Sequence, residues 1–407
     1  MIPMRQEFEK INFLVGNEKI LEEMKFSPAL PIFYSRILDF FSDLSNFLLK
    51  DGRSRQSADL TAFAYWIRKN SLQREKTLRE KIIPMRLGRG IVFHIAPSNV
   101  PLAFAMSFTA GLLSGNANIV RISSRDFFEV DIICDAINNL LEEKFSDLKK
   151  YFCFVRYPHD EEITKIFSKM CDVRVIWGGD NTIQTIRKIP LPPRAIELTF
   201  ANRHSVALID AEKFLNSDTD KVAKKFFDDT YRVDQNACSS PRIVIWFGEK
   251  IFDAQEKFWS AIKELAEKNY NMQAIQAVDK FSAACLLGMK NFGAKLQSVE
   301  NFVVRVEVEN LSENLFAEKP GGGFFIEYSA KQLEEIFPIL NKNCQTLAVF
   351  GIDKKILQEK IISAGVRGVD RIVELGETNR LNLLWDGFDL ICEMSRIVEV
   401  EDEKFFI

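Results

Sequence analysis

Cys238 is the cysteine whose sequence surroundings best suit a reactive thiol. It lies in the stretch DQNACSSPR, residues 234–242, where its neighbours are small and polar. The other six cysteines lie mostly in apolar stretches, such as 132–135 and 152–154, where a thiol packs as a small hydrophobic group. A nucleophilic cysteine must be a thiolate, which requires a lowered pKa or a nearby base. The flanking residues include no lysine or histidine, so activation must come from backbone amides or from residues distant in the sequence.

The bulk composition excludes several classes of protein. A net charge of −3, from 54 basic and 57 acidic residues in a chain of 407, gives no support for a nucleic-acid partner. Seven cysteines without a CxxC pair and three histidines suggest neither a disulfide framework nor a metal site. Reduced thiols and a start without an apolar signal-peptide core indicate a cytoplasmic protein.

Residues 90–120 contain no Asp, Glu, Lys or Arg and could be mistaken for a membrane span. Prolines and asparagines near 97–101, and glycines and asparagines near 111–118, interrupt the apolar run. A membrane helix needs about 20 continuous apolar residues. We therefore expect a buried strand, loop, helix and strand here, and no integral membrane segment.

From residue 91 onward, predicted strands alternate with predicted helices along the chain. A proline-rich run at 189–193 is interpreted as a hinge between two such regions. Predicted strands are 91–95, 118–122, 151–155, 173–177, 205–209, 242–246 and 346–350; predicted helices include 102–113, 127–143, 211–227, 251–268 and 331–340. This alternation predicts an α/β protein with two domains, mostly parallel sheets and helices on both faces. Such sheets bind ligands at the carboxyl ends of their strands.

Three segments resemble the acyl-CoA reductase (LuxC-type) family, a branch of the aldehyde dehydrogenase superfamily. They are GRGIVFHIAPSNVPLAFAMSFTAGLLSGNANIVRISSRD, VIWGGDNTIQTIRKIPLPPR and DQNACSSPR. The similarity extends from about residue 85 to the end of the sequence. It implies an aldehyde dehydrogenase-like fold and a reaction in which an acyl thioester, typically a long-chain acyl-CoA, acylates Cys238 and releases CoA. NADPH then delivers hydride to the thioester carbonyl, and a fatty aldehyde leaves.

The loop Pro97-Ser98-Asn99-Val-Pro follows the predicted strand 91–95 and is similar to the superfamily's Pro-x-Asn-x-Pro loop. There, an Asn amide and the N–H of the nucleophilic cysteine form an oxyanion hole. The resemblance implies a catalytic role for Asn99 and cofactor contacts for Pro97 and Ser98. The alternative is that Asn99 simply caps the helix that follows, since Asn is a favoured N-cap.

Arg121 stands where the superfamily has a lysine that holds the adenosine ribose of the cofactor. Three residues later, where NAD-preferring members often have a glutamate, this sequence has Ser124. A carboxylate would repel a 2′-phosphate, whereas Arg121, Ser123, Ser124 and Arg125 would accept one, so the resemblance favours NADPH over NADH. The alternative is a solvated turn at the end of a strand.

Gly178 and Gly179 fall where the superfamily turns from a strand into a helix beneath the cofactor pyrophosphate. Glycines permit close approach of the backbone there, and the helix N-terminus favours an anion. Asp180 would compete with phosphate for the same amides. It can instead be only an N-cap, with Thr182 facing the cofactor.

Two further positions are less well determined by the resemblance. Aldehyde-oxidising relatives have a Glu-Leu-Gly-Gly-Lys motif whose glutamate activates water, but here Glu197-Leu-Thr-Phe matches only at its start, which suits a reductase. His204 is then either a base for Cys238 or a structural imidazole at a strand edge. Glu318 is the candidate for the glutamate that holds the nicotinamide ribose, with Glu327 as the alternative. The three glycines between them predict a turn with positive φ.

The pattern of predicted elements and, from about residue 85 onward, the resemblance divide the chain into four regions. Residues 1–80 form a helical N-terminal segment, 81–200 a Rossmann-like NAD(P)-binding domain and 201–375 a catalytic domain with the cysteine. The tail, 376–407, packs on the cofactor domain or on an oligomer partner. A homo-oligomer and an acyl-protein synthetase partner are implied by the family.

Two other functions remain open from the sequence. The same Cys238 and Asn99 could reduce another activated acyl group, such as an acyl-protein thioester or an acyl phosphate. Alternatively, the chain could be a non-catalytic subunit that binds an acyl-activating partner. The retention of both residues argues against the last possibility.

Overall fold

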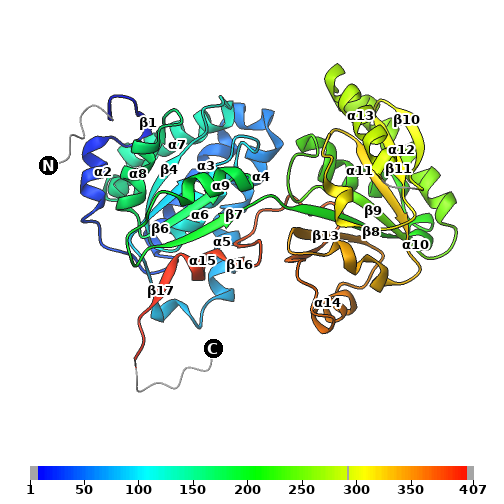
Figure 1. Cartoon of the computed structure of the whole chain (residues 1–407). Coiled ribbons are helices and arrows are strands. Elements are labelled where there is room, and N and C mark those ends of the chain that lie inside the picture. Colours follow the sequence, from blue (N-terminus) through cyan, green and yellow to red (C-terminus); the bar gives the residue numbers. More distant parts are fainter. Residues whose placement is uncertain (1–7, 291–292, 401–407) are drawn as a thin grey trace. The chain divides into compact units, whose positions relative to one another are not determined.

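The computed structural model describes residues 8–290 and 293–400, which divide into two compact units (Figure 1). Unit 1 comprises the residues up to Ala201 and those from Leu381 onward, and unit 2 comprises Asn202–Arg380. The chain therefore passes between the units after residue 201. The proline-rich run at 189–193 was predicted to be the hinge, but it lies within unit 1, ahead of that unit's last strand.

Unit 1 is built on a six-stranded sheet in the order β1-β5-β4-β3-β6-β7. All neighbours are parallel except β1, which pairs antiparallel with β5. The strands are β1 (Asn12–Val15), β3 (Ile91–Ile95), β4 (Ala117–Arg121), β5 (Phe152–Arg156), β6 (Val173–Trp177) and β7 (Ile196–Phe200). Because the chain proceeds outward from β3 to β5 and then returns to β6, the strand order reverses between β3 and β6. Ligands of such sheets bind at that switch point, beyond the carboxyl ends of the strands.

The helices of the βαβ units cover this sheet (Figure 1). They are α6 (Ala103–Leu113), α7 (Phe128–Glu143), α8 (Glu161–Met170) and α9 (Asp180–Arg187). Helix α6 is buried from Phe104 to Leu113, because its sequence is apolar on every side. The uncharged run that includes it is thus part of the core of unit 1. Among the described residues, no helix is both long and apolar enough to cross a membrane.

The first 80 residues belong to unit 1 rather than forming a separate segment. Their helices are α2 (Glu18–Met24), α3 (Ser35–Lys50), α4 (Ala58–Trp66) and α5 (Lys69–Leu78). Helix α3 presents Ile37, Phe40, Phe41 and Leu44 to the core, at the spacing expected of an amphipathic helix. Strand β1, which the sequence did not predict, joins the edge of the sheet.

Unit 2 contains a seven-stranded sheet in the order β10-β11-β12-β9-β8-β13-β14. Only the edge strand β10 is antiparallel to its neighbour. The strands are β8 (His204–Asp210), β9 (Pro241–Phe247), β10 (Lys295–Glu300), β11 (Val303–Glu307), β12 (Phe324–Ser329), β13 (Cys344–Phe350) and β14 (Arg371–Glu374). The helices are α10 (Ala211–Leu215), α11 (Thr219–Thr230), α12 (Ile251–Asn269), α13 (Ala274–Lys290) and α14 (Lys354–Ser363). Two apolar clusters cover this sheet.

Two helices of unit 2 differ from the sequence prediction. The helix expected at 211–227 is two helices, because Asp218 ends the connection and caps α11 through the N–H of Lys221. The helix expected at 331–340 is a short 3-10 helix, η6 (Leu333–Ile339), that contains Pro338. Proline lacks the N–H that an α-helix interior needs, which accounts for the shorter element.

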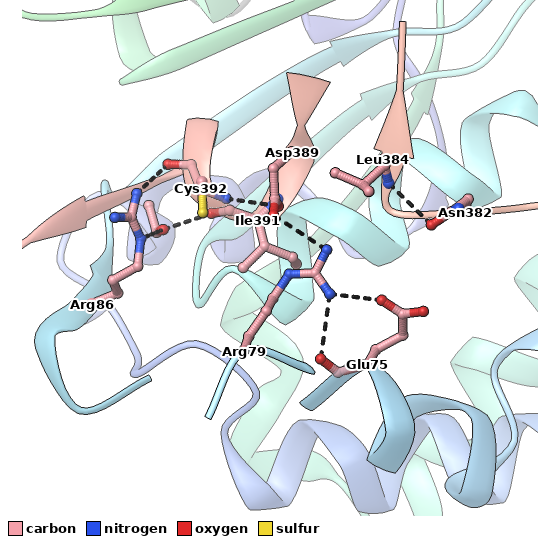
Figure 2. A network of polar contacts seen from close by, with 9 residues as sticks. Glu75, Arg79, Arg86, Asn382, Leu384, Asp389, Ile391 and Cys392 are labelled. Atoms are coloured by element: carbon pink, nitrogen blue, oxygen red, sulfur yellow. Dashed lines mark hydrogen bonds and ion pairs between the residues drawn. The ribbon is translucent and has the colours of Figure 1, made fainter. Parts of the chain in front are cut away.

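The C-terminal residues return to unit 1 from Leu381 onward. They form β15 (Leu384–Trp385), β16 (Phe388–Asp389), α15 (Leu390–Glu393) and β17 (Ser395–Ile397), and β17 pairs with β2 (Arg86–Gly88). Figure 2 shows Arg79 between Glu75 and Asp389, with Nη1 2.7 Å from the first carboxylate and Nη2 3.3 Å from the second. Arg86 donates to the carbonyl of Cys392 at 2.7 Å. The buried Arg79 and the partly buried Arg86 therefore attach this returning segment to the rest of unit 1.

Candidate active site

Cys238 lies in the loop that joins α11 to β9, so it is at the amino end of the strands of unit 2 rather than at their carboxyl end. The loop begins with two residues in the left-handed region, Asp234 (φ 51°) and Gln235 (φ 58°). The buried Gln235 side chain donates to the carbonyl oxygens of Pro241 and Phe324 at 3.0 and 2.9 Å. Its own oxygen accepts from the N–H groups of Gly323 and Phe324. One buried amide thus fixes the loop that carries the thiol.

Three side chains adjoin Cys238 from the surrounding strands. Ser205, on β8, donates from Oγ to the Cys238 carbonyl at 2.8 Å. Gln345, on β13, donates from Nε2 to the Cys238 sulfur at 3.3 Å. Arg242, on β9, donates from Nη2 to the Gln235 carbonyl at 2.8 Å. Burial lowers the pKa of Arg242 to about 10, and the charge of the Cys238 thiolate opposes that shift. The partly buried thiol therefore has an amide donor at its sulfur and a cation close enough to feel its charge.

The other cysteines differ from Cys238 in their surroundings. Cys134, Cys153, Cys171 and Cys344 are buried. Burial raises the pKa of each of these thiols, to about 12 for Cys153, Cys171 and Cys344. A thiol with so high a pKa is almost entirely protonated at neutral pH and is a poor nucleophile.

The glycine-rich turn packs against the loop of Cys238. Gly321, Gly322 and Gly323 all have positive φ, at 69°, 56° and 96°, so the predicted need for that conformation is confirmed. The N–H of Gly322 donates to the Asp234 carbonyl at 3.0 Å. A Cβ on Gly321 would lie 2.5 Å from the same oxygen. The glycines therefore allow one backbone to approach the other, which explains them without a cofactor.

His204 is enclosed by apolar and backbone groups. Its ring stacks on Phe316 with 3.4 Å between ring centroids, and Nε2 lies 3.4 Å from the Ile339 carbonyl oxygen. Burial lowers the pKa of His204 to about 4. An imidazole with this pKa is neutral at pH 7 and is a weak base. Its proposed action on Cys238 stays a prediction.

The two glutamates considered for the nicotinamide ribose have different environments. Glu318 accepts from Lys290 Nζ at 2.8 Å in a solvent-exposed ion pair. Glu327 is fully buried on β12, where it accepts from Trp246, Trp259 and Arg305. It is therefore not a solvated side chain, and its hydrogen bonds belong to the core. The cofactor contact of Glu318 stays a prediction.

In unit 1, the predicted cofactor residues gather at the carboxyl edge of the sheet. Pro97, Ser98 and Asn99 lie in the loop after β3, next to the β3–β6 switch point, and Ser98 and Asn99 are exposed. A small hollow there is lined by Ala96, Pro97, Val100, Phe104, Ser123 and Phe127. Helix α6 starts at Ala103 with Leu102 as its N-cap residue, so the alternative role of Asn99 as a helix cap is wrong.

Arginines cluster at the carboxyl ends of β4 and β5. The guanidinium of Arg121 lies over the ring of Tyr157, 4.6 Å from its centroid, and that of Arg125 lies over Phe127. Arg156 follows Val155, the residue that pairs with Arg121 across the sheet, and it donates from Nη1 to Asp126 at 2.7 Å. Nε of Arg121 and both Nε and Nη2 of Arg156 are buried without a hydrogen-bond partner among the described residues. Buried donors of this kind normally have a partner, so the cluster fits an anionic ligand.

Ser123 and Ser124 follow Arg121 at the same edge, with Ser124 exposed. After β6, Gly179 is the N-cap residue of α9 and Asp180 is the first residue of the helix. The Thr182 side chain lies over Gly178, where an added Cβ would approach it to 3.2 Å. The structure thus places the predicted pyrophosphate residues at a helix N-terminus beside the switch point. Their contact with a cofactor stays a prediction.

Sequence reasoning missed Gln345, Ser205 and Arg156, and it assigned no role to Arg242 in the DQNACSSPR stretch. The sequence offered a signal only for Arg156, a basic residue at the end of an apolar run, as Arg121 is. Among the described residues, no group of three or more His, Cys, Asp and Glu side chains could hold a metal ion.

Comparison with known families finds a match over most of the chain. The family described as acyl-CoA reductase (LuxC) matches residues 68–397. The long-chain acyl-protein thioester reductase of Aliivibrio fischeri is 25% identical over 298 residues, which cover 72% of this chain and 59% of the relative. Long-chain acyl-protein thioester reductase 2 of Photobacterium leiognathi is 24% identical over 379 residues, covering 85% and 73%. The chain thus spans about three fifths of the length of several curated relatives that it matches.

Solved structures with the same fold include aldehyde dehydrogenases. A variant of 1-pyrroline-5-carboxylate dehydrogenase from Thermus thermophilus superposes with a TM-score of 0.61 at 13% identity, covering 93% of this chain and 83% of that one. An NAD-dependent benzaldehyde dehydrogenase from Corynebacterium glutamicum gives a TM-score of 0.61 at 14% identity, covering 93% and 86%. The predicted aldehyde dehydrogenase-like fold is confirmed.

Proposed function

Because the chain belongs to the acyl-CoA reductase (LuxC) family, we propose that it reduces a long-chain acyl thioester to a fatty aldehyde through an acyl-enzyme on Cys238. The observation that carries this proposal is the environment of the thiol. Cys238 is partly buried, receives a hydrogen bond from Gln345 and lies near the cation of Arg242. Four other cysteines are buried and have raised pKa values.

The proposed chemistry is a balanced thioester exchange followed by reduction. The Cys238 thiolate attacks the acyl carbonyl, a new carbon–sulfur bond forms, and the thiol of the donor leaves with the electron pair of the broken bond. A nicotinamide cofactor, when bound, supplies the hydride that reduces the acyl-enzyme carbonyl. The carbon–sulfur bond then breaks to release the aldehyde and restore the thiolate. Asn99 is the proposed donor to the carbonyl oxygen during these steps.

The residues of unit 1 fit a nicotinamide dinucleotide. Arg121 and Arg156 carry buried N–H groups without hydrogen-bond partners in the described part of the chain, and an anionic ligand would satisfy them. Ser123, Ser124 and Arg125 add donors at the same edge, and this edge has no carboxylate where NAD-preferring relatives often have one. These features support NADPH, with the 2′-phosphate near Arg121 and the pyrophosphate near Gly178 and the start of α9. Glu318 is retained as the proposed contact of the nicotinamide ribose.

The proposed acyl donor is a long-chain acyl thioester, and the thiol that it carries is left open between two kinds. The description of the family names acyl-CoA as the substrate, whereas the names of the curated relatives give an acyl-protein thioester. Both donors present the same thioester carbonyl to Cys238 and differ in the thiol that leaves. An acyl-protein donor would make an acyl-protein synthetase a natural partner, and a homo-oligomer is proposed from the family resemblance.

The test is consumption of NADPH by the purified full-length chain, followed by absorbance, with acyl-CoAs of graded length and with a long-chain acylated protein as donors. Cys238→Ser is the test variant. Cys285→Ser is the matched control, because Cys285 is exposed on α13. We expect turnover with at least one donor, its loss in Cys238→Ser and its retention in Cys285→Ser. No turnover with either donor would overturn the reductase proposal, and turnover by Cys238→Ser would overturn the role of the thiol.

A further inference from the structure

We propose that Gln345 and Arg242 are positioning residues that hold the Cys238 sulfur as a thiolate, in place of a neighbouring general base. This inference rests on the proposed function of Cys238 as the nucleophile. It assigns the activating groups, which the sequence left open.

The two residues occupy equivalent irregularities on either side of β8. In the pairing of β13 with β8, Cys344 lies opposite His204 and Thr346 opposite Ser205, so Gln345 is an extra residue. In the pairing of β8 with β9, Ser205 lies opposite Pro241 and Val206 opposite Ile243, so Arg242 is an extra residue. Bulges of this kind redirect a side chain that a regular strand would send to one face of the sheet.

The two bulges flank Ser205, the residue whose hydroxyl binds the Cys238 carbonyl. Both bulges therefore lie beside the residue of the sheet that is hydrogen-bonded to Cys238. Two independent interruptions of regular pairing beside one residue indicate that the strands are shaped around the thiol.

The Gln345 amide is oriented for donation. The side chain is fully buried, and its oxygen lies 3.3 Å from the Thr346 hydroxyl, which donates to it. The NH₂ group is thus directed to the sulfur of Cys238. A donor with no charge favours the thiolate over the thiol, because the anion accepts the stronger hydrogen bond.

Arg242 supplies the opposite charge. Its guanidinium is anchored on the Gln235 carbonyl, within the loop of Cys238, and interacts electrostatically with the sulfur. His204, at the start of β8, has a pKa of about 4 and is neutral above pH 6. Burial raises the pKa of the Cys344 thiol on β13 to about 12, so that group is neutral as well. Lys319 and Arg203 add positive charge near that ring. Asp370, whose N–H donates to the Gln345 carbonyl, accepts from Arg203 at 2.6 Å and offsets that charge. Arg242 is the cation anchored in the loop of Cys238, and its charge favours the anion.

The experiment measures the pH dependence of alkylation of Cys238 by iodoacetamide in the full-length chain, with each cysteine peptide quantified by mass spectrometry. Gln345→Met removes the donor at similar volume, and Arg242→Met removes the cation. We expect either change to raise the midpoint pH for Cys238 by about one unit, the size of one charge-assisted hydrogen bond. Arg242→Lys should keep the midpoint near that of the native chain. Alkylation of the exposed Cys285 is the internal reference and should not change.

A matched control separates this effect from the loss of any buried amide. Gln255→Met removes an amide that is likewise buried but donates to Glu327, and it should leave the Cys238 midpoint unchanged. If Gln345→Met does not fold, the isosteric Gln345→Glu provides the same test and should raise the midpoint at least as far.

Unchanged midpoints in Gln345→Met or Gln345→Glu and in Arg242→Met would overturn the inference, even if NADPH turnover were normal. Shifted midpoints without turnover by the native chain would instead overturn the proposed function. The two failures are therefore distinguishable, because alkylation requires neither substrate nor cofactor.

Discussion

The arginine cluster of unit 1 makes the cofactor preference testable with one substitution. Arg121→Met keeps an unbranched side chain that still covers Tyr157 but removes the guanidinium. In the structure, Arg121 Nε is buried without a partner among the described residues. A hydrogen bond from such a group to a phosphate is worth about 1.5–3 kcal/mol. Since about 1.4 kcal/mol corresponds to a factor of ten, the Kd for NADPH should rise by roughly tenfold to a hundredfold.

The assay is a fluorescence titration of the full-length chain with NADPH and, separately, with NADH. NADH lacks the 2′-phosphate, so its Kd should change much less than that of NADPH. Arg187→Met is the matched control. Arg187 is an exposed arginine of α9 that pairs with Glu197, and Glu197 keeps its second partner, Arg174, at 2.5 Å. The control should leave both affinities unchanged.

If Arg121→Met weakened the binding of NADPH and of NADH equally, the assignment of Arg121 to the 2′-phosphate would be refuted, because the arginine would then contact a part that both cofactors share. An unchanged Kd for NADPH would refute it as well. The thermal midpoint is measured in parallel, since the cation–π contact with Tyr157 contributes about 0.5–1 kcal/mol to stability.

Two predictions concern stability. Burial lowers the pKa values of His94 and His204 to about 4. Between pH 6.5 and 4 the unfolded chain therefore binds protons that the folded chain does not, and the free energy of unfolding decreases as the pH is lowered. Burial raises the pKa of Asp229 to about 6, which acts in the opposite direction and offsets most of the effect in unit 2. When the pH is lowered from 7 to 4.5, hydrogen exchange should show that the free energy of unfolding falls by about 3 kcal/mol in unit 1 and by about 1 kcal/mol or less in unit 2. Arg305→Met leaves the buried Glu327 without its cation and should cost about 3–5 kcal/mol in urea unfolding.

Each of the two stability predictions has a control variant in the unit that it concerns. His94→Gln should remove the acid sensitivity of unit 1, and equal losses in the two units of the native chain would contradict the pKa argument. Glu256→Gln removes the exposed partner of Arg305 and should cost less than about 1 kcal/mol. A cost for Arg305→Met as small as this would show that the tryptophan donors alone satisfy Glu327.

Elements dominated by short-range pattern were predicted well. Strands β3 and β6 have the predicted bounds, because each is mainly apolar, with His94 and Arg174 as their single polar residues. Strand β12, Phe324-Phe-Ile-Glu-Tyr-Ser, was missed because it directly follows the glycine-rich turn, and it carries the charge of Glu327 in its middle. That charge is acceptable only because Trp246, Trp259 and Arg305 reach it from other elements. Partners of this kind are not visible in a local pattern.

The sequence by itself determined which residues are candidates for chemistry. Cys238 stands out because small polar neighbours exclude it from an apolar core. Asn99 and Arg121 stand out because their segments resemble motifs of the LuxC-type family. The tertiary structure alone decided which groups adjoin the thiol. Gln345 lies 107 positions from Cys238 in the sequence, and it reaches the sulfur only because a bulge redirects its side chain. A bulge is a property of how two distant strands pair, and no local sequence pattern specifies that pairing.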